Sequence, residues 1–155
     1  MWWHLSSKEF EKGQGEGNKN AMKRFVKSGK IPGILGYFDK MAVAWCSVAP
    51  REDYASLNRS RVLKPIDDQQ VWSMVCFFIA KQFRGQGTLL QLINGAVHFV
   101  KSNGGNIIEA YPTVPRGKEM PPVSSFMGIP RVFQKAGFKI CAQPSPSKVI
   151  MRKYL

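Results

Sequence analysis

The chain has 155 residues, with 23 lysines and arginines against 10 aspartates and glutamates, and its formal net charge at pH 7 is +13. This length fits a single domain over 1–155, and a hydrophobic fraction of 44% is enough for a packed core, so global disorder is excluded. The basic surface would attract an anionic partner: nucleic acid, membrane headgroups or a small polyanion such as a nucleotide cofactor.

The cysteines and histidines are too few and too scattered for a disulfide framework or a metal site. Cys46, Cys76 and Cys141 form no Cys-x-x-Cys pair, and their odd count favours a reducing compartment. With two histidines besides, no metal-ligand cluster has suitable spacing. No segment reaches the roughly 18–20 apolar residues that cross a bilayer, and residues 1–4 are too short for the hydrophobic region of a signal peptide. We therefore expect a cytoplasmic protein without a membrane partner.

The N-terminal region is predicted to be irregular and then helical. Residues 1–17 are mostly polar and glycine-bearing, so we expect an irregular segment. Asn18 is a suitable N-cap, and apolar side chains follow it at helical spacing as far as Gly29, a suitable C-cap. The sequence therefore predicts a helix over 18–28.

Two apolar runs then predict a β-hairpin. Residues 34–38 and 41–49 are rich in aromatic and aliphatic side chains, and a short polar pair separates them. Pro50 ends the second strand because it has no N–H for the ladder. Residues 51–70 are polar and charged, so we expect a long connection of the kind that often carries function.

A buried strand, a glycine turn and a helix come next. Residues 71–80 are β-branched and aromatic without strict alternation, which predicts a central strand buried on both faces. The turn at 81–88 holds two glycines. Apolar residues then recur at three- and four-residue steps until Gly104-Gly105 stops the helix.

The C-terminal elements complete one sheet. Residues 106–111 predict a strand, 112–124 hold four prolines and predict a loop, and 125–136 suit a short helix. Residues 137–142 and 149–155 predict two final strands. This order of helices and strands indicates an α/β or α+β fold around one mixed sheet.

The strand, turn and helix over 71–103 carry the functional argument. The first turn of a helix has unpaired N–H groups and a partial positive charge, and glycines before it let an anion such as a diphosphate approach the backbone. Arg84 adds a guanidinium beside that point. The same glycines are also typical of an ordinary tight turn. A P-loop is excluded by its spacing, and so is the dinucleotide fingerprint, because Leu90 stands where its third glycine belongs.

Residues 71–111 resemble the core of the GNAT acetyltransferases, whose signature is Gln/Arg-x-x-Gly-x-Gly/Ala between a central strand and a helix. The signature can be aligned with the sequence in two frames. Frame 82–87 matches it at every position, whereas frame 84–89 departs at its last position, where Leu89 replaces a small residue. We favour frame 84–89 because it places the apolar side chains of the helix where the family buries them. These side chains are Leu92, Ile93, Ala96 and Val97.

The resemblance continues in 133–138, which is similar to the family's late helix and Gly-Phe turn, and it covers roughly 31–155. It implies the GNAT fold, a twisted and mostly antiparallel mixed sheet whose central strand pair is splayed and which helices flank. It also implies acetyl-CoA as cosubstrate, bound by a core over 71–138.

The resemblance implies specific roles. Backbone groups of Phe77, Phe78 and Ile79 would pair with the pantetheine arm, and Phe133 would lie near the acetyl thioester. Backbone N–H groups would hold the diphosphate, and they belong to Arg84, Gly85, Gln86, Gly87 and Thr88.

The catalytic groups are less defined. Phe133 stands where many family members have a tyrosine that protonates the leaving thiolate. A phenyl ring cannot donate a proton, so another acid, a water or no acid would serve. Glu109 is the first candidate for the general base and Tyr111 the second. The alternative for Glu109 is a structural hydrogen-bond partner. The family's first strand has no counterpart, which would leave an apolar sheet edge and favour a homodimer.

Three functions remain open at this stage. The first is an N-acetyltransferase for a primary amine that the sequence does not identify. The second is an acyl-CoA sensor without turnover, which the phenylalanine at 133 favours. The third is a basic nucleic-acid-binding module, which ranks below the others because no RNP, zinc-finger or KH signature accompanies the charge.

Overall fold

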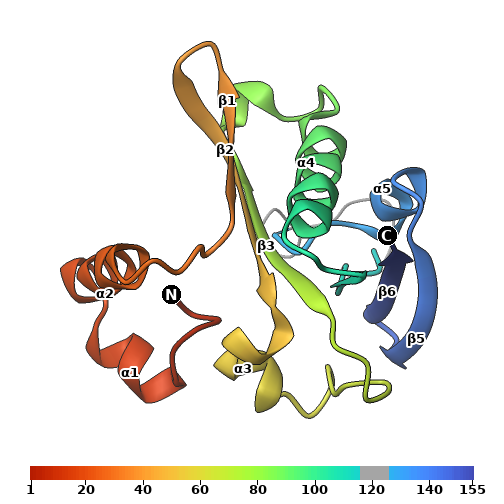
Figure 1. The fold of residues 1–155 in the computed structure, drawn as a ribbon, viewed down its shortest axis with the longest axis horizontal. Helices are drawn as coiled ribbons and strands as arrows, with labels where there is room; N and C mark the ends of the chain where they lie inside the picture. Colours follow the sequence, from red (N-terminus) through yellow and green to blue (C-terminus); the bar gives the residue numbers. More distant parts are fainter. Residues whose placement is uncertain (116–125) are drawn as a thin grey trace.

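The computed structural model describes residues 1–115 and 126–155, which form one sheet with helices on both faces (Figure 1). The strand order is β1-β2-β3-β4-β6-β5, and the β3–β4 pair is parallel whereas the other neighbouring pairs are antiparallel. The predicted mixed, mostly antiparallel sheet is therefore confirmed. The strands are β1 (Ile34–Phe38), β2 (Met41–Pro50), β3 (Trp72–Ile79), β4 (Ile107–Ala110), β5 (Lys139–Ser145) and β6 (Lys148–Tyr154).

The helices divide between the two faces of the sheet. They are α1 (Ser7–Lys12), α2 (Glu16–Lys27), α3 (Ala55–Asn58), α4 (Thr88–Ser102) and α5 (Pro130–Lys135), with 3-10 turns at Arg51–Asp53 and Lys81–Phe83. Helices α4 and α5 cover one face, and α1, α2 and α3 lie on the other (Figure 1). The hairpin, the central strand and the long helix after the glycine turn are thus confirmed.

Helix α1 corrects the prediction that 1–17 is irregular. Ser6 accepts a hydrogen bond from the backbone N–H of Glu9, and the Glu9 carboxylate accepts one from the N–H of Ser6. This reciprocal capping box satisfies two donors that a helix start leaves unpaired. Helix α2 also begins earlier than the predicted 18–28, at Glu16.

The connection at 51–70 is more ordered than its polar composition predicts. It contains the turn at Arg51–Asp53 and helix α3, and it buries Tyr54, Leu57 and Leu63 against the sheet. These apolar side chains are spaced among charged ones, so the segment folds as a cover for the face opposite α4.

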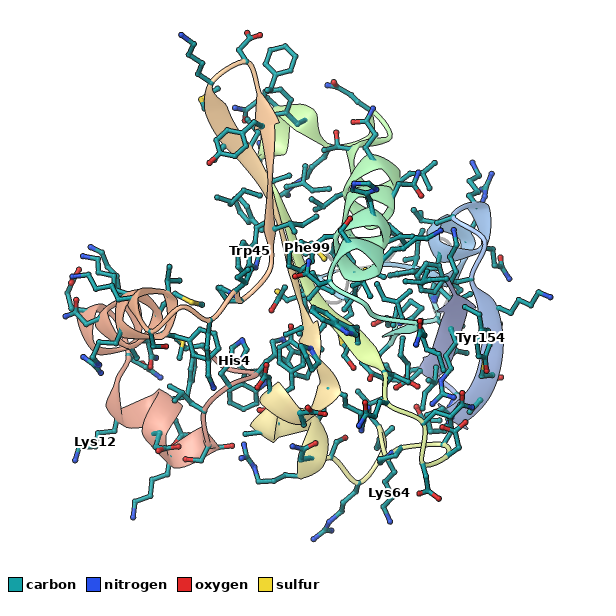
Figure 2. All side chains as sticks on the ribbon, in the orientation of Figure 1. His4, Lys12, Trp45, Lys64, Phe99 and Tyr154 are labelled. Carbon is teal, nitrogen blue, oxygen red and sulfur yellow. The ribbon has the colours of Figure 1, made fainter. Side chains whose placement is uncertain are left out.

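Each face of the sheet has its own apolar core. On one face, α4 packs Leu92, Ile93 and Ala96 against the sheet. On the other face, Tyr54 and Leu57 pack with Tyr111, Met127 and Ile150, and Trp3 lies against them. Figure 2 shows the same division, with Phe99 on the α4 side and His4 among the side chains of the opposite face.

Strands β3 and β4 part after a short parallel register. Trp72, Ser73 and Met74 pair with Ile108, Glu109 and Ala110, and β3 then runs on to Ile79 beside β2 alone. Pro112 lies just beyond β4 and has no N–H to extend the ladder. The last residues of β3 therefore present one free backbone edge to the opening between the two strands.

Strand β1 is the outer edge of the described sheet. Leu35, Tyr37 and Phe38 are exposed on it, and the register shifts between Gly36 and Tyr37. A bulge of this kind interrupts the row of backbone groups that another strand could pair with. Formation of a homodimer through this edge stays a prediction.

Candidate functional site

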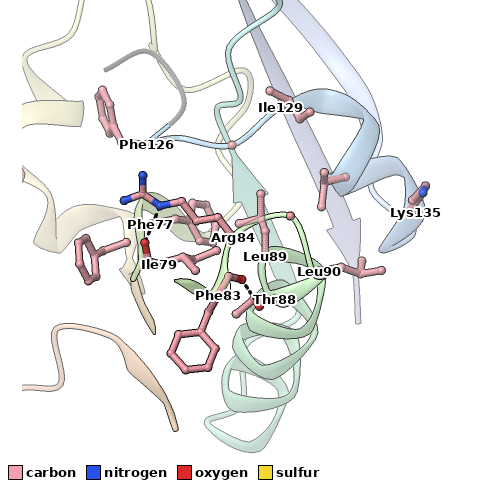
Figure 3. A pocket seen from close by; sticks show the side chains of 15 residues that line it. Phe77, Ile79, Phe83, Arg84, Thr88, Leu89, Leu90, Phe126, Ile129 and Lys135 are labelled. Carbon is pink, nitrogen blue, oxygen red and sulfur yellow. Dashed lines mark hydrogen bonds between the residues drawn. The ribbon is translucent and has the colours of Figure 1, made fainter. Parts of the chain in front are cut away.

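The site begins at the turn between β3 and α4. Gly85 and Gly87 have φ values of 74° and 83°, a left-handed conformation that other residues rarely adopt, and α4 starts directly after them at Thr88. Two side chains fix the turn: Thr88 Oγ1 donates to the carbonyl of Phe83 (2.7 Å), and Arg84 Nε donates to the carbonyl of Ile79 (2.8 Å) (Figure 3).

The turn presents a run of unpaired backbone donors. The N–H groups from Gly85 to Leu89 have no hydrogen-bond partner among the described residues, and the first bond within α4 is from Leu90 N–H to the carbonyl of Gly87. A β-carbon added at either glycine would meet no atom within 4 Å, so the turn is open on its outer side. Donors of this kind at the positive end of a 15-residue helix are suited to an anionic ligand.

A cavity of about 650 Å³ joins this turn to the free edge of β3 (Figure 3). Its walls are mostly apolar, and Arg84 and Lys135 are its basic residues. Phe126, Gly128 and Ile129 close the side opposite the turn. The predicted binding residues that line it are Phe77, Phe78, Ile79, Arg84, Gly85, Gly87 and Thr88.

Two backbone groups at the free edge of β3 already have protein partners. Phe77 N–H donates to the carbonyl of Phe126 (2.7 Å), and the carbonyl of Ile79 accepts from Arg84. Phe77 and Ile79 therefore face the opening. Alternation along the strand turns the backbone of Phe78 toward its register partner Trp45 on β2. The prediction that all three residues offer backbone groups to a ligand is thus corrected for Phe78, whose exposed ring lines the cavity instead.

Solved structures share this arrangement at low sequence identity. The PaiA N-acetyltransferase of Thermoplasma acidophilum, in complex with coenzyme A, matches with a TM-score of 0.56 and 17% identity, over 97% of this chain and 80% of that one. A GNAT-family acetyltransferase of Streptococcus agalactiae matches with a TM-score of 0.57 and 17% identity, over 96% and 79% of the two chains. The chain has the GNAT fold.

A third GNAT-fold neighbour is an acetyltransferase of Bacillus subtilis in complex with coenzyme A, with a TM-score of 0.52 and 13% identity over 97% and 94% of the two chains. The sequence itself matches no family model and no curated protein. Within the GNAT fold, the start of α4 at Thr88 and the burial of Leu92 and Ile93 support frame 84–89 for the signature.

Two predicted binding residues do not line the cavity. The Gln86 side chain turns back, and its Nε2 donates to the carbonyl of Gln82 (2.8 Å). Phe133 is fully buried, with its ring edge-on to Phe77 and Phe138. This ring supports the cavity wall from behind, through its contact with Phe77, and its place near a bound thioester stays a prediction.

Glu109 and Tyr111 lie together, but in the interior. The Glu109 carboxylate accepts from Arg152 Nε (2.7 Å), Arg51 Nη1 (3.2 Å) and the Tyr111 hydroxyl (2.6 Å). Both residues have 0% exposure and neither lines the cavity. Burial, followed by the charge of Glu109, raises the pKa of Tyr111. This arrangement gives an acceptor amine no access to the two candidate bases. It therefore favours the alternative that Glu109 is a hydrogen-bond partner that supports the fold.

The sequence did not predict the cavity residues that follow the proline-rich loop. These residues are Phe126, Gly128, Ile129, Val132 and Lys135. Lys135 could have been found, because it lies in the late helix two positions after Phe133. The others follow the proline-rich loop and have no local signal for a place beside β3. Residues 116–124 of that predicted loop, and position 125 of the predicted helix, lie outside the described residues.

The described residues hold no group of three histidine, cysteine, aspartate or glutamate side chains that could bind a metal ion. None of the helices in the described part of the chain has the length and apolar character to cross a membrane.

Proposed function

We propose that the chain binds acetyl-coenzyme A in this cavity and transfers its acetyl group to a primary amine. One observation carries the proposal: the N–H groups of Gly85, Gly87, Thr88 and Leu89, which have no partner among the described residues, and the free edge of β3 border the same cavity. The first suits a diphosphate and the second suits an extended amide-bearing chain. Coenzyme A carries both groups in one molecule.

The charges in the cavity fit this ligand. Arg84 and Lys135 are basic, and none of the residues that line the cavity is acidic. A guanidinium binds phosphate oxygens through several donors, and an ammonium binds them as a point charge. At the β3 edge, the backbone groups of Phe77 and Ile79 face the opening and suit the amides of the pantetheine arm, because β3 pairs with β4 only as far as Met74.

The transfer needs little acid catalysis. The neutral amine nitrogen attacks the thioester carbonyl carbon, a carbon–nitrogen bond forms, and the carbon–sulfur bond breaks. Coenzyme A leaves as a thiolate, and the proton of the amine passes to water and finally to that thiolate. A thiol with a pKa of about 8.5 is a tolerable leaving group without a proton donor. In this proposal Phe133, Glu109 and Tyr111 stabilise the fold and take no part in the chemical step.

Isothermal titration with acetyl-coenzyme A tests the binding step. Gly87→Glu places a carboxylate in the diphosphate position and should abolish binding. Gly15→Glu is the matched control, because Gly15 also precedes a helix, has a φ of 75° and has no atom near its β-carbon position. Wild-type affinity in the Gly87 variant would exclude the turn as the anion site.

Binding without turnover is the second candidate function. The cavity lining contains no carboxylate, histidine or tyrosine, so the residues that line it include no evident general base or acid. An acyl-CoA sensor would bind the coenzyme but release no free thiol across a panel of amines. Release of coenzyme A thiol together with an acetylated amine, identified by mass spectrometry, would decide for the transferase.

A further inference from the structure

Residues 126–128, which we call the strap, lie between the parted strands β3 and β4. Phe77 N–H at the free edge of β3 donates to the carbonyl of Phe126 (2.7 Å). Thr113 N–H, just beyond β4, donates to the carbonyl of Gly128 (3.0 Å). The strap thus bridges the two strands where their own pairing has ended. Phe126 and Gly128 also line the cavity, and Figure 3 shows Phe126 on the side opposite the glycine turn.

The strap is anchored in the apolar core on the face of the sheet away from α4. Met127 is 3% exposed and packs in the core that contains Tyr111 and Ile150. Lys148 Nζ lies 3.0 Å from Met127 Sδ and donates to Thr113 Oγ1 (2.8 Å). Lys148 therefore ties the middle of the strap to the chain that follows β4.

The C-terminal end of the strap requires glycine. Gly128 has a φ of 76°, and a β-carbon there would lie 2.7 Å from Cε2 of the buried Phe133. Phe126, at the other end, has a partly exposed ring. The strap is consequently fixed at Met127 and Gly128, and among the described residues its one backbone hydrogen bond to β3 is the bond from Phe77 to Phe126.

That hydrogen bond uses a group that a strand-like ligand needs. Phe77 and Ile79 are the residues whose backbone groups face the opening, so an arm that pairs with this edge takes the Phe77 N–H. An N–H makes one strong hydrogen bond, and the carbonyl of Phe126 already accepts it. The strap and the arm therefore compete for the same donor.

We propose that the strap is an autoinhibitory contact, which must leave Phe77 before an acyl-pantetheine arm can dock along β3. The inference rests on the proposed coenzyme A binding and adds a gate to it. When a site is open for only a fraction of the time, its apparent dissociation constant is the intrinsic value divided by that fraction. Loosening the strap should therefore strengthen binding, and fixing it should weaken binding.

The first test loosens the strap at its tether. Lys148→Met removes the donors to Thr113 and Met127, and Lys148→Arg keeps donors at that position. Lys139→Met is a control for the same chemical change on β5, because Lys139 also begins a strand but is exposed, whereas Lys148 is half-buried. We expect Lys148→Met to lower the dissociation constant for acetyl-coenzyme A about fivefold and to speed association, with the other two variants unchanged. Equal affinity in all three folded variants would overturn the proposal.

The second test fixes the strap with a disulfide. Cys76 packs against the core that contains Met127, and their neighbours Phe77 and Phe126 are hydrogen-bonded. Met127→Cys in a Cys141→Ser background should, after oxidation, bind acetyl-coenzyme A at least tenfold more slowly than the same protein after reduction. Equal rates for the oxidised protein, with its two thiols lost, would contradict the gate. Absence of binding in wild-type and reduced protein alike would contradict the proposed function, and with it the role of the strap.

Discussion

Arg152 on β6 donates from Nε to the carboxylate of Glu109 on β4 at 2.7 Å, and both side chains are almost completely buried. Arg51 reaches the other oxygen of the same carboxylate at 3.2 Å. Glu109 thus pairs with two interior guanidinium groups, of which Arg152 also pairs with Asp67, and it ties the long 51–70 connection to the sheet.

Glu109→Gln should destabilise the fold but leave coenzyme binding intact. The amide keeps the shape and removes the charge, so the buried Arg51 loses its carboxylate partner and Arg152 keeps only Asp67, at a cost of about 3 kcal/mol in the free energy of unfolding. Urea denaturation measures this cost, and titration with acetyl-coenzyme A measures the affinity. A variant with wild-type stability that binds but no longer transfers would restore Glu109 as the base.

Asp67 should make the stability of the protein depend on pH in the acid range. Hydrogen bonds from Arg152, followed by those of its own loop, lower the pKa of Asp67 from 3.8 to about 2. Because the folded protein holds the ionised form, this stabilisation is complete above pH 4 and is lost as the pH falls from 4 through 2. The stability difference between wild type and Asp67→Asn should therefore shrink over that window. A difference that does not change with pH would contradict the pairing.

His4 should add a second pH dependence nearer neutrality, and here the folded protein favours the neutral form of the side chain. Its ring lies between Phe25 and Tyr54, Nδ1 is 3.0 Å from the carbonyl of Asp53 and so carries the proton, and Nε2 is buried without a partner among the described residues. Burial, as the largest cause, lowers the pKa of His4 from 6.5. The folded state thus favours neutral imidazole, and stability is lost as the pH falls below 6.5.

Thermal unfolding between pH 5 and pH 7.5 measures the His4 effect. His4→Phe keeps an aromatic ring between Phe25 and Tyr54 but cannot be protonated, so it should flatten the dependence of the melting temperature on pH in this range. An unchanged slope would assign the dependence to other groups.

Leu89→Ala should strengthen coenzyme binding if the proposed site is correct. Leu89 lines the cavity in the first turn of α4, at the signature position where the GNAT acetyltransferases have a small residue. Removing the isobutyl group opens the approach to the N–H groups of the turn, and alanine favours the helix. We expect an affinity about threefold higher by calorimetry, with Leu90→Ala as the control in the same lining. Weaker binding would show that Leu89 contacts the ligand favourably.

The parts of the site that local sequence controls were predictable. The glycine turn, the helix after it and the buried β3 depend on backbone conformation and on apolar spacing over adjacent residues. Helix α1 was also encoded locally, in the Ser6 and Glu9 capping pair, but nearby glycines concealed it. The burial of Phe133 and the pairing of Phe77 with Phe126 depend on segments distant in the chain, and no local pattern specifies them.

The short parallel register between β3 and β4 also has a mechanical consequence. Strands β1–β3 with α4 form one plate and strands β4–β6 with α5 form another, and the hydrogen bonds that join them along the sheet come from Trp72–Met74 opposite Ile108–Ala110. Rotation of the plates about this seam would therefore break fewer backbone hydrogen bonds of the sheet than bending either plate. Exchange of amide hydrogens should accordingly be faster along this seam than inside each plate.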